Sequence, residues 1–229
     1  MNKNLLLIIF LTISYSSFAQ LNFNAGFTYS RTISGVNNEI LQQVNDNNSR
    51  LINFKKMKPI NGLYGFHFGT QFRFDAVAFS LNWDSKVQVS DFKGDDTLGV
   101  NIINIHRELF YRVTSTSAGI EYFPINNFSF GGTIDLNRLR IRSANNVNQD
   151  RYTVMRDSGL SSHFFVSLNI EGSDILSISL QPYIQIPWTK FDLAPLESDL
   201  NSGINATNFE DDFMNIGIRL IFKNGQQNF

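Results

Sequence analysis

Three polar residues in the second half of the chain are the best candidates for catalytic chemistry. Ser161, His163 and Ser167 fall on alternate positions, so a strand would point them the same way. A serine that meets a histidine base is the pairing used by many hydrolases and acyltransferases. However, no Gly-x-Ser-x-Gly motif is present, and no third residue is placed by sequence alone to orient His163. We expect no enzyme, with a lipid-modifying enzyme as an alternative.

Residues that could ligate metals are scattered. The chain has no cysteine, and its three histidines show no metal-ligand spacing: His67, His106 and His163. Two acidic clusters could bind a divalent cation but are also explained as solvated loop charges: Asp91, Asp95 and Asp96, and Glu210, Asp211 and Asp212. We therefore predict no metal site and no cofactor.

The first residues have the pattern of a secretory signal peptide. Lys3 precedes an apolar run from Leu5 to Ile13, and Ser17-Phe18-Ala19 forms a cleavage point before Gln20. The sequence thus predicts a signal peptide over 1–19 and one β-barrel domain over 20–229. Without Lys3, 18 of the 19 basic residues remain against 20 acidic ones, a formal charge of −2. This balance gives no basic footprint for nucleic acid, so no nucleic-acid partner is expected.

Strict alternation of apolar and polar residues is the main structural signal. This alternation runs through eight segments. About 9 to 11 residues are enough for a tilted strand to cross a bilayer. The segments are 21–29, 66–74, 77–83, 105–123, 128–136, 164–170, 176–186 and 214–222. In 105–123 the apolar parity changes, which suggests a β-bulge near Thr114 to Ser117. Pro182 suggests another local bulge, because proline has no N–H to donate to a neighbouring strand.

The connections between these segments alternate strictly in length. The connections at 75–76, 124–127 and 171–174 are tight, whereas those at 32–61, 92–104, 143–159 and 187–211 are long and polar. Short periplasmic turns and long external loops are typical of outer-membrane barrels. The sequence therefore predicts an all-β, eight-stranded antiparallel up-and-down transmembrane β-barrel in the outer membrane, with both termini periplasmic. A secreted β-sandwich is the alternative, but it would not separate its loops by length.

The polar rows of such a barrel face its lumen and include charged residues. An eight-stranded barrel is about filled by its own side chains, so these charges must pair. We expect salt bridges that join Arg73 and Arg219 to Glu121 and Asp135. This lumen charge network would be a polar plug, and the alternative is a gated, narrow solute channel.

Two of the long loops carry apolar residues. Val36, Ile40 and Val44 fall at i, i+4 and i+8 after Ser34, which predicts a capped amphipathic helix over the barrel mouth. The fourth loop holds five residues that either fold back onto the barrel or form a docking surface: Trp188, Phe191, Leu193, Leu196 and Phe209.

The chain resembles the small outer-membrane β-barrel proteins of Bacteroidota, the OmpA-like or PorT-like group. The resemblance rests on four stretches: Phe18-Ala19-Gln20, the Tyr122-Phe123 turn into Asn127-Phe128, Gln181-Pro182-Tyr183, and Gly217 to Phe222. It implies insertion by the outer-membrane assembly machinery, which favours a terminal aromatic residue, here Phe222 or Phe229. Some members of the group serve protein secretion.

Together these observations favour a non-enzymatic protein. Its barrel would sit in outer-membrane lipid and anchor external loops for structural roles or for binding a protein partner. A narrow solute channel and a PorT-like secretion accessory are the alternatives.

Overall fold

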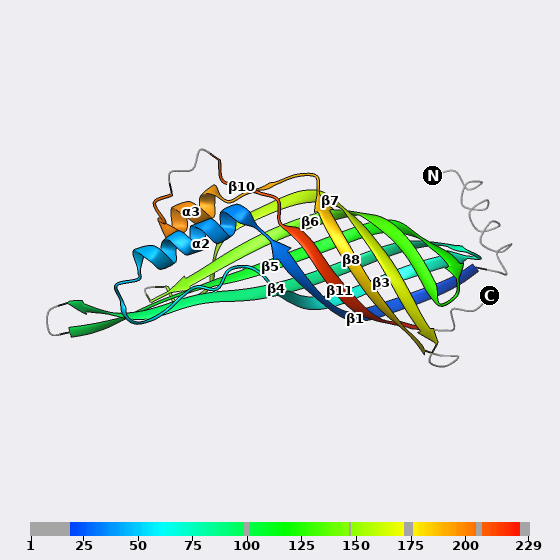
Figure 1. The fold of residues 1–229 in the computed structure, drawn as a ribbon, viewed down its shortest axis with the longest axis horizontal. Helices are drawn as coiled ribbons and strands as arrows, with labels where there is room; N and C mark the ends of the chain where they lie inside the picture. Colours follow the sequence, from blue (N-terminus) through cyan, green and yellow to red (C-terminus); the bar gives the residue numbers. More distant parts are fainter. Residues whose placement is uncertain (1–18, 99–100, 147, 172–175, 205–207, 225–229) are drawn as a thin grey trace, which may run out of the picture.

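A computed structural model describes residues 19–98, 101–146, 148–171, 176–204 and 208–224. The signal peptide predicted over 1–19 lies outside the described residues except for Ala19. Nearly all of the described chain belongs to one sheet that is rolled into a barrel (Figure 1).

Eight long strands close this barrel. Their bounds are β1 Ala19–Ile33, β3 Leu63–Phe74, β4 Val77–Leu98, β5 Asn101–Ile125, β6 Phe128–Asn145, β7 Tyr152–Glu171, β8 Leu176–Pro187 and β11 Met214–Asn224. Each strand pairs antiparallel with the next, and β11 pairs with β1 to complete the ring. The predicted eight-stranded antiparallel up-and-down barrel is confirmed.

The outer wall of the barrel is apolar on every strand. Each strand exposes large side chains there, for example Phe23, Phe66, Leu81, Ile120, Ile134, Phe164, Ile186 and Ile216. The inner wall is polar and buried, with residues such as Gln71, Asp84, Asp135, Gln185 and Arg219. Because alternate residues of a strand point to opposite faces, the alternation in sequence produces this division directly. An exposed apolar girdle around a polar interior is the arrangement of a membrane-spanning barrel.

Beyond the girdle the barrel is unequal in height. In Figure 1, the β4–β5 hairpin extends far past the other strands at the end that carries the two helices, and the ends of β6 and β7 rise beside it. The β4–β5 ladder runs without a shift to Leu98↔Asn101, and β6 pairs with β7 up to Ser143↔Tyr152. The long loops predicted at 92–104 and 143–159 are therefore largely wrong, since most of their residues are paired strand. Polar composition alone did not distinguish a loop from a strand that stands in water.

The irregularity expected in the fourth strand has a different cause. Pairing of β5 is continuous through Thr114 to Ser117 on both sides, so the predicted bulge is wrong. Leu109, Tyr111 and Val113 point inward, as do Ser115 and Ser117 further down the strand. The inward residues are apolar where the strand lies beyond the girdle and polar where it lines the lumen. The apolar parity changes because the surroundings change, while the strand itself stays regular.

Pro182 also sits in a regular strand. It pairs with Ile218 of β11, and the β7–β8 ladder keeps one register on either side, from Phe165↔Tyr183 to Leu168↔Leu180. Pairs are missing only at Pro182, which has no N–H to donate, and at the adjacent Gln181. The bulge expected there is wrong, and a local gap in the ladder takes its place.

Two helices and a hydrophobic cluster cover the extended strands. The helix α2, Gly35–Asn47, buries Ile40 and Val44, as the spacing in the sequence predicts, together with Leu41, while Val36 is only partly buried. The short helix α3, Ala194–Leu200, buries Leu196 beside it. These residues meet the inward apolar residues of β5 and β6, and we call the whole cluster the outer core. None of the helices in the described ranges is long and apolar enough to span a membrane.

Three short strands complete the same end. They are β2 Ile52–Lys55, which pairs with β4, and the two-residue pair β9 Phe191–Asp192 and β10 Glu210–Asp211. The first and fourth predicted loops therefore fold into a compact cap rather than remaining extended in water.

Candidate functional site

A chain of ionisable side chains crosses the lumen at mid-height. His67 Nδ1 lies 2.9 Å from Asp84 Oδ1, and Arg219 Nη2 donates to Asp84 Oδ2 at 2.6 Å. Arg219 Nη1 donates to His163 Nε2 at 3.1 Å, and His163 Nδ1 lies 3.5 Å from Asp135 Oδ2. All five side chains are buried. This central network joins β3, β4, β11, β7 and β6, so it ties distant parts of the sequence together inside the barrel.

Tyr183 of β8 extends the central network to two further groups. Its ring stacks on His163 with 4.4 Å between centroids, and the Arg219 guanidinium carbon lies 4.8 Å from the ring centroid. Its hydroxyl accepts a hydrogen bond from Lys86 Nζ at 3.3 Å and lies 3.2 Å from Thr28 Oγ1. An aromatic face beside a cation is attractive, and more so where water is excluded. Tyr183 therefore fills the middle of the lumen and brings β1 into the network.

The pairing differs from the one expected from the sequence. Arg219 pairs with Asp84, a residue that the predicted network did not include. Glu121 accepts hydrogen bonds from Gln71 and Ser129. The expected ion pairs of Arg219 with Glu121 and with Asp135 are wrong. The ion-pair partner of Arg219 is set by which strands face each other across the barrel.

Arg73 lies at the opposite end of the lumen from the outer core. Its Nε donates to the carbonyl of Asp75 at 2.9 Å, and its Nη2 donates to Asn126 Oδ1 at 3.0 Å. The guanidinium carbon also lies 3.9 Å from the ring centroid of Phe123. Arg73 thus binds the turns that close this end of the barrel.

Little space remains between these side chains. A cavity of about 10 Å³ lies among residues that include Asn137, Ser161 and Gln185, and one of about 20 Å³ lies beside His67 and Glu121. A cavity must offer about 10 to 15 Å³ to hold a single water molecule. The lumen is therefore packed at the level of the central network, with the outer core above it.

The serine and histidine considered for catalysis lie within this packed lumen. Asp135 lies next to His163 and is the orienting residue that the sequence did not reveal. Ser161 Oγ donates to Asp135 Oδ2 at 3.4 Å, while Ser167 Oγ accepts from Gln181 Nε2 at 2.9 Å. In the described part of the chain, neither serine hydrogen-bonds to His163. Activation of a serine by a histidine base requires the two to be within hydrogen-bond reach, and in this structure both serine hydroxyls bond to other lumen side chains instead.

The five apolar residues of the fourth predicted loop are divided between two environments. Phe191, Leu193 and Leu196 are buried in the outer core, and Phe209 packs partly against it. Trp188 is 55% exposed and directly follows β8 at the edge of the apolar girdle. Three of the five side chains therefore lie inside the protein and are not accessible to a partner.

The acidic clusters are used within the cap. Asp211 accepts hydrogen bonds from Ser34 Oγ at 2.7 Å and from the backbone N–H of Asn37 at 2.8 Å, at the start of α2. The carboxylate therefore caps the helix in place of Ser34, whose side chain makes no cap bond. Lys55 Nζ donates a hydrogen bond to Asp91 Oδ2 at 2.9 Å. This hydrogen bond and, to a smaller extent, the positive charge of Lys55 hold the pKa of Asp91 below its usual range. Across the described residues, no group of three acidic, histidine or cysteine side chains is placed to hold a metal.

The ring of eight strands, the apolar girdle and the packed polar lumen define an outer-membrane-type β-barrel. Solved structures of similar fold include Ail, the attachment invasion locus protein of Yersinia pestis, in complex with the heparin analogue sucrose octasulfate. That match has 10% identity, a TM-score of 0.46, and covers 90% of this chain and 97% of Ail. Neisserial surface protein A is 8% identical, with a TM-score of 0.44, and the match covers 91% of this chain and 98% of that protein. At these identities the likeness concerns the fold alone.

No protein family model matches the chain, and no curated protein matches it in sequence.

Proposed function

We propose that this chain is a non-enzymatic outer-membrane protein whose sealed barrel anchors a folded external cap for structural or interaction roles. The observation that carries the proposal is the filled lumen. The central network and Tyr183 occupy its middle, and the outer core lies over its mouth. Buried charges are tolerated when they are paired and hydrogen-bonded, as Asp84 and Arg219 are here. A permanent plug therefore accounts for the polar lumen without a transported solute.

The orientation of the barrel in the outer membrane is part of the same proposal. Short turns such as 75–76 and 126–127 lie at one end of the barrel, and the cap lies at the other. In outer-membrane barrels the short turns are periplasmic and the long connections are external. The cap would then face outward, both termini would lie in the periplasm, and the outer-membrane assembly machinery would insert the chain. Membership of the OmpA-like or PorT-like group of Bacteroidota is part of this proposal and rests on the stretches quoted from the sequence.

Planar-bilayer recording tests the sealed lumen. The protein is refolded into lipid vesicles, and its altered gel mobility before boiling shows that the barrel has closed. The vesicles are then fused with a planar bilayer, and a general porin is recorded in the same apparatus to show that channels are detected. The proposal predicts no conductance steps above those of protein-free lipid. Steady, discrete steps from the folded protein would support the narrow channel and reject the sealed anchor.

A further inference from the structure

Five arginines lie together on the outer surface of the barrel, just beyond the apolar girdle. Arg112 of β5 pairs directly with Arg140 of β6, and Arg140 pairs directly with Arg156 of β7. We call these three the arginine row. Arg138 and Arg142 flank Arg140 on the same face of β6. Neighbouring strands are about 4.8 Å apart, so the row spans about 10 Å.

These charges have no acidic partner among the residues that the structure describes. Throughout the described residues, none of the five arginines takes part in an ion pair, and the nearby Glu108 is paired with Arg151 at 2.7 Å. Arg140 Nη2 donates to Thr153 Oγ1 at 2.9 Å, but its Nε is buried without a hydrogen-bond partner. Like charges directly opposite each other destabilise a sheet. The row is therefore built at a cost in folding stability that an anion bound from outside would offset.

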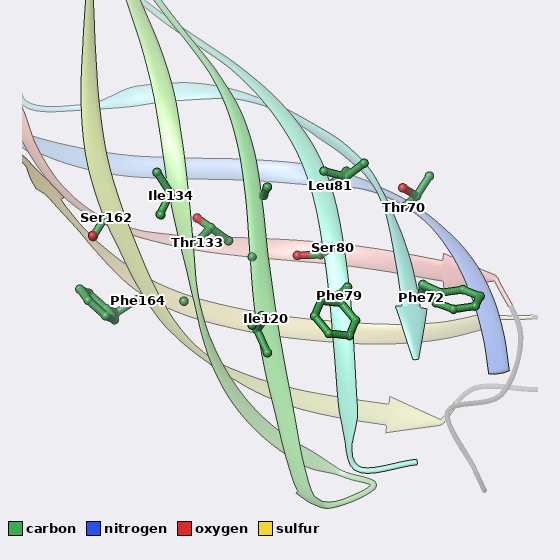
Figure 2. A pocket seen from close by; sticks show the side chains of 13 residues that line it. Thr70, Phe72, Phe79, Ser80, Leu81, Ile120, Thr133, Ile134, Ser162 and Phe164 are labelled. Atoms are coloured by element: carbon green, nitrogen blue, oxygen red, sulfur yellow. The ribbon is translucent and has the colours of Figure 1, made fainter. Parts of the chain in front are cut away.

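A hollow in the apolar girdle lies on the same strands. Ala118, Ile134 and Ser162 stand six residues from Arg112, Arg140 and Arg156 along β5, β6 and β7, on the side away from the cap. Together with Phe79, Ile120 and Phe164 they line a depression of about 680 Å³ in the outer wall (Figure 2). The small side chains of Ala118 and Ser162 and the bare backbone of Gly132 leave this space between larger apolar neighbours.

The separation of the row and the hollow matches one lipid leaflet. Six residues extend about 20 Å along a strand, which a tilt of about 40° reduces to roughly 15 Å of depth. The hydrocarbon of a bilayer is about 30 Å thick, so one leaflet contributes about 15 Å. A lipid with its headgroup at the row would thus place its acyl chain in the hollow.

We propose that the arginine row and the hollow form one binding site for an outer-leaflet lipid whose headgroup carries more than one phosphate. The guanidinium groups bind the phosphates, since their planar pairs of N–H donors match phosphate oxygens. A row about 10 Å long that is flanked by two further arginines is wider than a single phosphate requires. The hollow takes one acyl chain. This inference rests on the proposed function, because the row meets outer-leaflet headgroups only when the cap faces outward.

Lipid binding to the folded protein in detergent tests the site. The probes are diphosphoryl lipid A and monophosphoryl lipid A, with inorganic phosphate as a soluble competitor. We expect the diphosphoryl lipid to bind at least tenfold more tightly than the monophosphoryl form, and millimolar phosphate not to displace it. Equal affinity for the two lipids, or displacement by millimolar phosphate, would overturn the proposal in favour of no site or a free-anion site.

Variants locate the binding to the named residues. Changing Arg112, Arg140 and Arg156 together to Gln should weaken diphosphoryl lipid A binding at least tenfold. The matched control removes three exposed positive charges from the cap instead, through Arg50→Gln, Lys56→Gln and Lys58→Gln. It should change the affinity less than twofold. Unchanged binding by the row variant, or equal losses in both variants, would overturn the assignment.

Filling the hollow separates the acyl chain from the headgroup. Ala118→Phe adds a ring to the lipid-facing wall without entering the lumen, and it should weaken binding of the lipid at least fivefold. Gel mobility before boiling shows for each variant that the barrel has folded. If the cap is shown to lie outside the cell and the lipid still fails to bind, this inference fails while the proposed function stands.

Discussion

Arg219→Met is expected to be among the most damaging substitutions in the lumen. It removes hydrogen bonds of 2.6 Å to Asp84, 2.9 Å to Gln181 and 3.1 Å to His163. It also leaves the Asp84 carboxylate, which is 1% exposed, without its cation. Breaking a buried ion pair from one side costs about 3 to 5 kcal/mol. Because Asp84 keeps its contact with His67, we expect about 3 kcal/mol, roughly a hundredfold in the unfolding equilibrium.

Urea unfolding in lipid vesicles measures this loss, with tryptophan fluorescence and gel mobility as two readouts. The control is Arg31→Met on the exposed face of β1, which should change stability by less than about 0.5 kcal/mol. The double variant Asp84→Asn with Arg219→Met should lose at least about 1.5 kcal/mol less than the sum of the two single losses. A loss below 1 kcal/mol for Arg219→Met, or additive losses in the double variant, would refute the network as an energetic unit.

Three further substitutions or conditions test other parts of the structure. Ile40→Ala removes a fully buried side chain of the outer core and should destabilise the cap by about 2 to 5 kcal/mol. The expected result is faster proteolysis within 35–47, while the gel mobility of the barrel stays unchanged. Loss of the mobility shift would contradict a cap that is separate from the barrel. Gly217→Ala should destabilise the barrel, because its Cβ would lie 2.5 Å from a Tyr183 ring carbon, and urea unfolding indistinguishable from the parent would count against that packing. The Asp91–Lys55 contact should persist from pH 7 to 5 and weaken only as the pH falls through the lowered pKa of Asp91, below its usual 3.8. Amide hydrogen exchange of β2, corrected for intrinsic rates, reports on this contact. Faster exchange of β2 already at pH 5 would argue against the contact.

The girdle could be predicted from the sequence because burial in lipid and burial in a lumen impose opposite preferences on alternate residues. Ile134 and Asp135 show this contrast in adjacent positions of β6. The same logic failed beyond the girdle. There Leu139 points inward to the outer core while Arg138 and Arg140 point outward, so the apolar residues change parity within one continuous strand.

The lumen pairing could not be predicted because it depends on the stagger of the closed barrel. Asp84 and Arg219 are 135 residues apart, and no local pattern brings them together. The helix over 35–47 was predictable because its contacts recur every three or four residues. The capping residue Asp211 was not predictable, since it lies 174 residues away from Asn37, whose backbone N–H donates to it.

Topology labelling on intact cells tests the central claim most directly, namely that the barrel spans the outer membrane with its cap outside. The chain has no cysteine, so each introduced thiol is unique. Asp150→Cys lies in the exposed connection between β6 and β7 at the cap end, and Asn127→Cys lies in the exposed turn between β5 and β6 at the other end.

A membrane-impermeant maleimide should label Asp150→Cys on intact cells, and should label Asn127→Cys only after the outer membrane is permeabilised. The reverse pattern, or equal labelling of both before permeabilisation, would contradict the account.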